Sequence, residues 1–190
     1  MSTLTVQNLR GIAPNYQIIV PAGHKIVTQS GGLYAPGGVV QVLQTVKTDV
    51  FGTSSTSYVD VTGMSVSITP MSTSSKIMVI GGISFGPSTT AQYAQFGRLM
   101  RNGSAIFIAD AAGNRDRGTF SFQEGGFEGP LSLHFNYLDS PASSTSVTYN
   151  IQIRAESPQT AYINRGVEND GDASITPRAV SSLTVMEIAQ

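Results

Sequence analysis

The sequence predicts an all-β fold, in which residues 37–190 form an antiparallel sandwich or barrel behind a short strand-rich N-terminal segment, residues 1–36. Many short stretches alternate apolar and polar side chains with a period of two, as strands with one buried face do. Clusters of Gly, Pro, Asn and Ser separate these stretches at close intervals, which is typical of sandwiches and barrels. No stretch shows capped apolar i, i+3, i+4 spacing, so no helix is predicted.

The composition limits the classes of function. With 190 residues the chain suits one domain plus an appendage. Charged residues make up only 12% of it, and the net charge of −1 predicts no nucleic-acid partner and no anionic membrane surface. The absence of cysteine excludes disulfides and thiolate metal sites. No apolar run approaches membrane-spanning length and no secretory signal is visible, so we expect no membrane insertion.

Residues 1–36 differ from the rest of the chain. Their apolar residues come in short bursts between turn-forming residues, and strands this short cannot close a core alone. We expect a stalk that buries its apolar residues only when three chains wind or pack together. A flexible leader is the alternative, although the apolar residues are frequent for a solvated linker.

The main domain opens with a strand pair. Tyr58–Pro70 alternates apolar and polar residues, but the apolar parity changes at Thr62-Gly63. We therefore predict a β-bulge at Gly63, and the end of the strand at Pro70, which cannot donate to a ladder. After a polar turn at Ser72–Ser75, Lys76–Ile80 is more continuously apolar, which predicts a buried strand.

Later strands follow the same logic. Asn102-Gly103 between two apolar runs predicts a hairpin, because both residues tolerate positive φ. Clean alternation predicts Tyr149 and Ile151 as core residues. Further strands are predicted at Leu131–Tyr137, Val147–Arg154, Tyr162–Arg165 and Ser181–Ile188, with polar loops at 110–119, 125–130, 139–146, 155–161 and 166–178.

Several framework motifs resemble small domains in tail-fibre and other appendage proteins of tailed bacteriophages, especially marine and cyanobacterial phages. They cover nearly the whole chain and are Met1–Leu9, Val20–Ile26, Ser55–Gly63, Ile68–Pro70, Ser74–Val79, Arg98–Gly103, Val147–Arg154 and Ser182–Ala189. The hairpin and the last two strands also resemble the trimeric heads of complement-type proteins and tumour necrosis factor. The resemblance implies a jelly roll, a homotrimer and a location in the virion.

Two functions fit this resemblance. In the first, the chain is a tail-fibre or receptor-binding protein: residues 1–36 attach it to other virion proteins, and the head contacts a host-surface glycan. In the second, it is a capsid decoration protein whose N-terminal segment clamps capsid subunits. The size of the chain suits both functions, and the resemblance favours the first.

The sequence contains no complete motif for a catalytic or metal site, so we predict no enzyme, no cofactor and no metal. His24 and His134 are too far apart in the chain to indicate one site, and no nucleophile elbow or phosphate loop is present. The 12 acidic residues leave a pair of catalytic carboxylates open, as in polysaccharide-cleaving spikes. The acidic loop Glu168–Asp172 offers oxygen ligands of the kind Ca²⁺ takes, but it matches no complete calcium motif, so a solvated loop is the simpler interpretation.

Two loops concentrate groups that suit sugar hydroxyls. Arg supplies a planar donor fork, Asp accepts hydrogen bonds from vicinal hydroxyls, and Tyr offers a ring face. A solvated, self-paired loop is an equally good interpretation of the first group. The candidate receptor-binding residues are Asp110, Asn114, Arg115, Asp116 and Arg117 in the first group, and Tyr162, Asn164, Arg165 and Asp170 in the second.

Overall fold

The computed structural model describes residues 20–24, 35–87, 93–123, 129–156, 159–167 and 177–190. Within these residues all regular structure is β, which confirms the predicted class, and no helix is long and apolar enough to cross a membrane. The strands are β1 (Val39–Lys47), β2 (Phe51–Thr53), β3 (Val59–Ile68), β4 (Lys76–Pro87), β5 (Ala94–Arg101), β6 (Ser104–Ile106), β7 (Phe120–Gln123), β8 (Leu131–Asp139), β9 (Val147–Arg154), β10 (Ala161–Ile163) and β11 (Ser181–Ile188).

The chain divides into two units, Met1–Leu33 and Tyr34–Gln190. In the first unit only residues 20–24 are described, and they form a turn in which the His24 N–H donates to the Pro21 carbonyl at 3.1 Å. Apart from residues 35 and 36, the rest of the predicted stalk lies outside the described residues. The stalk and its packing with other copies therefore stay predictions.

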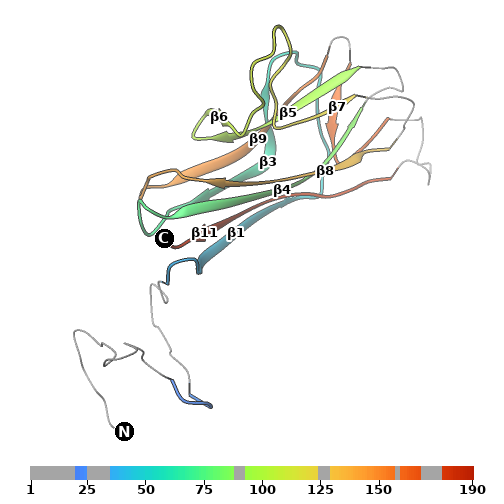
Figure 1. The fold of residues 1–190 in the computed structure, drawn as a ribbon. Helices are drawn as coiled ribbons and strands as arrows, with labels where there is room; N and C mark the ends of the chain where they lie inside the picture. The colour runs from blue at the N-terminus through green and yellow to red at the C-terminus, as the bar shows by residue number, and fades with distance from the viewer. Residues whose placement is uncertain (1–19, 25–34, 88–92, 124–128, 157–158, 168–176) are drawn as a thin grey trace. The chain divides into compact units, whose positions relative to one another are not determined.

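The strands of the second unit form two antiparallel sheets (Figure 1). In the first sheet the order is β1-β11-β4-β10-β2, and β8 pairs with the other edge of β4. In the second sheet the order is β3-β9-β5-β6, and β7 also pairs with β5. The two sheets face each other as a jelly-roll-like sandwich.

One buried side chain joins two interrupted strands of the first sheet. β1 and β2 are separated by residues 48–50, beside the gap between β10 and β11. Asn164 lies at this break with φ of 67°, and its Nδ2 donates to the carbonyls of Lys47 (2.7 Å) and Asp49 (2.9 Å). Its Oδ1 accepts from the Ser181 hydroxyl at 2.7 Å. Because it replaces the missing ladder hydrogen bonds, the amide satisfies backbone groups that would otherwise be buried without partners.

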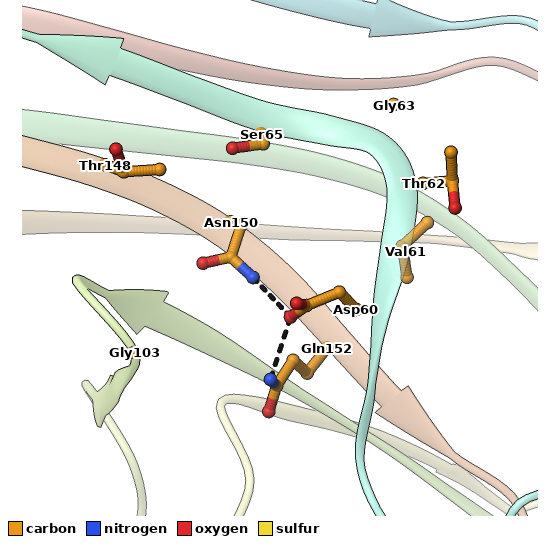
Figure 2. A pocket seen from close by; sticks show the side chains of 9 residues that line it. All are labelled: Asp60, Val61, Thr62, Gly63, Ser65, Gly103, Thr148, Asn150 and Gln152. Carbon is orange, nitrogen blue, oxygen red and sulfur yellow. Dashed lines mark hydrogen bonds between the residues drawn. The ribbon is translucent and has the colours of Figure 1, made fainter.

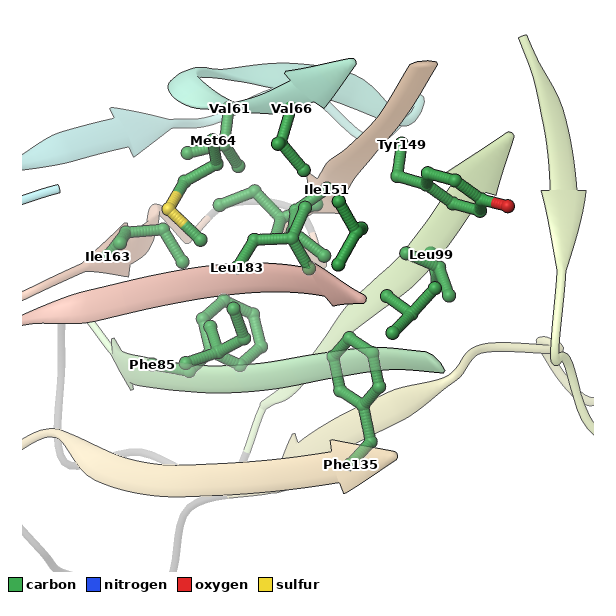
Figure 3. Packing of buried hydrophobic residues seen from close by; sticks show 14 of the residues in the cluster. Val61, Met64, Val66, Phe85, Leu99, Phe135, Tyr149, Ile151, Ile163 and Leu183 are labelled. Carbon is green, nitrogen blue, oxygen red and sulfur yellow. The ribbon is translucent and has the colours of Figure 1, made fainter. Parts of the chain in front are cut away.

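The core lies between the sheets and consists of their inward-facing apolar side chains (Figure 3). Tyr149 and Ile151 are both 0% exposed, which confirms them as core residues. An added Cβ at Gly81 or Gly97 would lie within 2.2 Å of the ring of Phe135 or Phe120, so these two glycines make room for stacked aromatic rings.

A polar contact crosses the core at one end. Asp139 on β8 accepts a hydrogen bond from the Tyr149 hydroxyl on β9 (2.6 Å), and Nη1 of Arg101 on β5 donates to both of its carboxylate oxygens (2.7 and 2.9 Å). Burial, together with the hydrogen bond to Asp139, raises the pKa of Tyr149 far above its usual range. The two sheets are thus joined by a charge-assisted network as well as by apolar contact.

The predicted boundaries hold for most strands. β9 and β11 match the prediction, the hairpin turns at Asn102-Gly103 with positive φ at both residues, and Gly63 has φ of 83° at a register shift between β3 and β9. The short strand predicted at Tyr162–Arg165 ends earlier, because Asn164 turns the chain. β7 was not predicted, and Asp139, predicted in a turn, is the last residue of β8.

The strand at Lys76–Ile80 differs from its prediction in burial. It continues to Pro87, and Ile77 and Val79 are 0% exposed as predicted. Ile80, on the opposite side of the same strand, is 39% exposed. The described residues form a core on one side of this sheet only, so the outer side of β4 is only partly covered at Met78 and Ile80.

Candidate functional site

The outer face of the second sheet, here called the polar face, carries long polar and aromatic side chains on three neighbouring strands. The register places Asp60 of β3 beside Gln152 of β9, and Gln152 beside Arg98 of β5. In the adjacent row, Arg154 of β9 lies beside Phe96 of β5. Strands that are distant in sequence thus bring polar groups together on one rigid surface.

At one end of the polar face, two arginines stack on aromatic rings. The Arg98 guanidinium lies 3.9 Å from the centroid of the Tyr58 ring, and that of Arg154 lies 4.1 Å from the centroid of Phe96. Asp116 forms an ion pair with Arg154 and accepts from the Tyr58 hydroxyl at 3.2 Å. Burial and the nearby Asp116 carboxylate raise the pKa of Tyr58. Stacking and pairing hold these side chains in fixed orientations.

A hydrogen-bond network continues from this cluster along the face. Arg98 donates from Nε (2.9 Å) and Nη2 (2.6 Å) to Oε1 of Gln152. Gln152 Nε2 donates at 2.8 Å, and Asn150 Nδ2 at 2.6 Å, to the same oxygen, Oδ1 of Asp60. The two amides are thereby oriented. Among the described residues, Oδ2 of Asp60 has no hydrogen-bond partner.

Beside Asp60 the face is hollowed, with a volume of ≈ 350 Å³ (Figure 2). Between the pairs Asp60↔Gln152 and Ser65↔Asn150, β3 has the four residues 61–64 where β9 has only Ile151. The extra residues bend β3 away from β9 and form one wall. The hollow is lined by Asp60, Val61, Thr62, Gly63, Ser65, Gly103, Thr148, Asn150 and Gln152.

The wall formed by residues 61–64 is fixed by contacts with β1 and with the core. Gly63 lies at the bend with φ of 83°, a backbone conformation that costs free energy for residues other than Gly. The Gly63 carbonyl accepts a hydrogen bond from the Thr45 hydroxyl of β1 at 3.0 Å. Val61 and Met64, on either side of the bend, are 3% and 0% exposed, so they anchor it in the core. The hollow is therefore a built feature of the strand pair.

The first group of predicted receptor residues lies on the loop between β6 and β7. Asp116 is drawn onto the polar face by Arg154 and Tyr58, and the Arg117 guanidinium donates from Nε to the Ala109 carbonyl at 2.6 Å. Asp110, Asn114 and Arg115 are exposed. The loop is thus partly self-paired, and its charged groups are not all directed at one point.

The second group belongs to the other sheet. The Arg165 guanidinium stacks on the Tyr162 ring at 4.2 Å. Asn164 is 1% exposed, and its amide donates to the carbonyls of Lys47 and Asp49 at the break between β1 and β2. Its role is therefore to stabilise the fold. Asp170 lies outside the described residues. The structure brings Asp116 together with the polar face and leaves the two predicted groups on different sheets.

No metal centre is formed by the residues that the structure describes, since no three His, Cys, Asp or Glu side chains gather there. The acidic loop Glu168–Asp172 lies outside them. His24 is exposed in the turn at residues 21–24, and His134 is exposed on the outer side of β8, next to Gly82 of β4.

The outer face of the first sheet has a different character. The register aligns four apolar side chains across four strands, here called the apolar row: Val42 of β1, Met186 of β11, Met78 of β4 and Leu138 of β8. Val42 is 52% exposed and Leu138 45%, and Val46 (52%) and Ile80 (39%) extend the exposed apolar surface. At the outward positions of these strands, only Lys76 and His134 carry a titratable group.

Sequence reasoning missed the residues that matter most on the polar face. The polar parity of Val147–Arg154 was visible and identifies Asn150, Gln152 and Arg154 as outward-facing. Their partners Tyr58, Asp60 and Arg98 lie in distant segments of the sequence, and pairing over such distances leaves no local pattern.

No protein-family model matches the chain, and neither does any curated protein. Among solved structures, it is similar to the VP2 subviral particle protein of infectious bursal disease virus, with 12% identity and a TM-score of 0.36 over 79% of this chain and 38% of that one. A mutant VP2 of the same virus, in T=1 particles, gives 11% identity and a TM-score of 0.38 over 91% of this chain and 41% of that one. The chain thus spans about two fifths of the length of each protein.

Proposed function

We propose that the chain is a virion structural protein of a tailed bacteriophage: a homotrimeric tail-fibre or receptor-binding protein whose head contacts a glycan on the host surface. The phage setting is supported by the framework motifs in the sequence. The role is structural and adhesive, with no catalytic step.

The observation that carries the proposal is the apolar row. Val42, Met186, Met78 and Leu138 form an apolar band across four strands of the first sheet, and Ile80 lies in the next row of the register. Contiguous apolar surface of this kind is uncommon on monomers and marks an interaction site. The outward positions of these strands carry no carboxylate, so two such faces meet without charge repulsion.

The occupant we assign to this face is a second copy of the chain. Three copies arranged around a threefold axis would bring these faces together in a closed ring, which forms when the rotation between neighbouring copies closes. In a trimer each polar face then points away from the axis, where it is free to meet a host surface. A stable assembly of this kind buries on the order of 2,000 Å² or more in total.

The test uses two matched leucines on one strand. Leu138 is 45% exposed on the outer side of β8, and Leu131 is 40% exposed at an inward-facing position of the same strand. We expect Leu138→Asp to convert the trimer into monomers in sedimentation experiments, because a charge would be buried in the interface. Leu131→Asp should stay trimeric. A monomeric unchanged chain at micromolar concentration contradicts the proposal. A Leu138→Asp variant that remains trimeric moves the interface elsewhere, residues 1–36 included.

Attachment and role are tested in particles. Deletion of residues 1–36 should leave a folded head that no longer enters virions, whereas normal incorporation would place attachment on the sandwich. A few copies at the tail, counted on purified virions, support the fibre. Tens to hundreds of copies on the capsid would replace it with the decoration role.

A further inference from the structure

We propose that the hollow beside Asp60 is a binding site for a neutral saccharide, and that it is the receptor contact of the head. This inference rests on the proposed function for the biological source of the sugar. The site lies on the strands of the polar face, not on the loop at 110–117 that the sequence had suggested.

The lining selects the chemistry of the ligand. The hollow presents the free Oδ2 of Asp60, the Oδ1 of Asn150 and the hydroxyl of Ser65, which have no hydrogen-bond partner among the described residues. These groups match a ligand rich in hydroxyls, which both donates and accepts. A carboxylate at the centre disfavours phosphates and other anions, and a single carboxylate is too few for a divalent cation. An apolar ligand would leave the lining polar groups without water or partners.

The geometry fits one sugar ring. A volume of ≈ 350 Å³ is at the small end of the range of ligand sites, roughly 300–1,000 Å³. The backbone at Gly63 and Gly103 forms part of the rim, so a ring can approach the main chain closely there. Figure 2 shows Asp60 between the amides of Asn150 and Gln152, with Ser65 and Thr148 on the far side of the hollow.

The site is also held rigid before any ligand arrives. Both amide donors are bound to Oδ1 of Asp60, and Gln152 is fixed in turn by two hydrogen bonds from Arg98. Arg98 is stacked on Tyr58. This chain of contacts orients the carboxylate so that Oδ2 remains available, and preorganisation of this kind reduces the entropic cost of binding.

A single hollow of this depth binds weakly, and a trimer compensates for it. Three equivalent sites on one particle component raise avidity without new contacts. Millimolar affinity for a monosaccharide is therefore the expected behaviour of the isolated head, with tighter retention on a surface that repeats the sugar.

The experiment measures binding of four methyl pyranosides (glucoside, galactoside, mannoside and N-acetylglucosaminide) to the full chain by calorimetry and saturation-transfer NMR. We expect at least one to bind with millimolar affinity. Asp60→Asn, which keeps the shape but removes the carboxylate, should weaken it by about tenfold or more. Ser65→Leu fills the hollow without removing any hydrogen bond among the described residues, and it should abolish binding even if Asp60→Asn folds poorly. The matched control is Asp110→Asn, which removes an exposed carboxylate outside the hollow and outside the chain of contacts that orients Asp60, and it should leave affinity unchanged.

The outcomes separate this inference from the function it rests on. No binding of any of the four glycosides, or binding that Asp110→Asn abolishes and Ser65→Leu does not, overturns the saccharide site. Sedimentation of the same samples reports the trimer independently. A monomer that still binds sugar through the hollow therefore contradicts only the trimeric fibre, and a trimer that binds none contradicts only the site.

Discussion

On the outer side of the first sheet, side chains aligned across four strands form the apolar row, whereas the equivalent positions of the second sheet carry Asp60, Gln152, Arg98 and Arg154. The polar side chains satisfy one another, so the polar face is stable in water by itself. The apolar row has no such option, and each Å² of it removed from water contributes roughly 25 cal/mol. One sandwich thus has a face that favours a partner of its own kind and a face that is complete without one.

The two faces differ in this way only while the two sheets stay packed against each other. The largest expected effect is therefore at Asp139, which joins the sheets through Tyr149 and Arg101. Asp139→Ala leaves the Tyr149 hydroxyl buried without its acceptor and Arg101 without its carboxylate, so it should lower the free energy of unfolding by roughly 2–4 kcal/mol. Urea denaturation measures the loss. Asp110→Ala, which replaces an exposed carboxylate, is the control and should change stability by less than about 0.5 kcal/mol. Equal effects of the two substitutions would show that the contact across the core contributes nothing.

The next prediction concerns the apolar face. If a second copy covers it, the melting temperature of the unchanged chain should rise with protein concentration, because association stabilises the folded state by mass action. Ile80→Asp should remove that dependence. Met71→Asp is the control, since Met71 is 50% exposed in the segment that follows β3 and lies off the sheet. A melting temperature of the unchanged chain that ignores concentration would mean that the face remains open.

The apolar face also marks where the sequence misled. Lys76–Ile80 is apolar at both parities, and we predicted a buried strand. The structure buries Ile77 and Val79 and exposes 39% of Ile80. The apolar pattern indicates that both sides of the strand are removed from water. It does not indicate whether residues of the same chain or of another chain bury them. The predicted burial of Ile80 becomes correct only if the proposed trimer forms.

Single strands and their core residues were predictable, because alternation in Val147–Arg154 fixes which side Tyr149 and Ile151 occupy. The hollow was not predictable. The hollow forms because β3 pairs with β9 and the bulge at Gly63 lies beside Asn150. A bulge that is visible in the sequence of one strand does not indicate which strand pairs with it. Asn164 was assigned to receptor binding from its residue type, but its positive φ and buried amide show that the break in the first sheet uses it.

A smaller effect is expected near the C-terminal end of β11 in the first sheet, where Glu187 is 0% exposed. Burial alone would raise its pKa, but hydrogen bonds from Gln41, Ser75 and the Met71 N–H outweigh burial, so the pKa lies below its ordinary 4.5. The ionised form therefore stabilises the fold above pH 4.5, and this contribution is lost as pH falls through the lowered pKa.

Glu187→Gln should lower stability at neutral pH by about 1–3 kcal/mol, because a charged acceptor is replaced by a neutral amide. It should also flatten the loss of stability on acidification, measured by urea denaturation at a series of pH values below 5. Gln190→Glu, which adds a carboxylate at an exposed position near the same strand end, is the control for general charge effects. If the acid limb of the pH profile is as steep in Glu187→Gln as in the unchanged chain, another carboxylate is responsible.

The smallest effect is expected on the polar face itself, at the contact that holds the loop at 110–117. Asp116 pairs with Arg154 and accepts from Tyr58, but its side chain is 22% exposed, and exposed ion pairs contribute little. Asp116→Ala should therefore cost less than about 1 kcal/mol of global stability, and salt should reduce the difference further. Hydrogen exchange should accelerate in the loop and stay unchanged in β9, where Asp60 still holds Asn150 and Gln152. Faster exchange along β9 would show that the cluster at Tyr58 and the network at Asp60 act as one unit, so that the polar face depends on its loop to remain ordered.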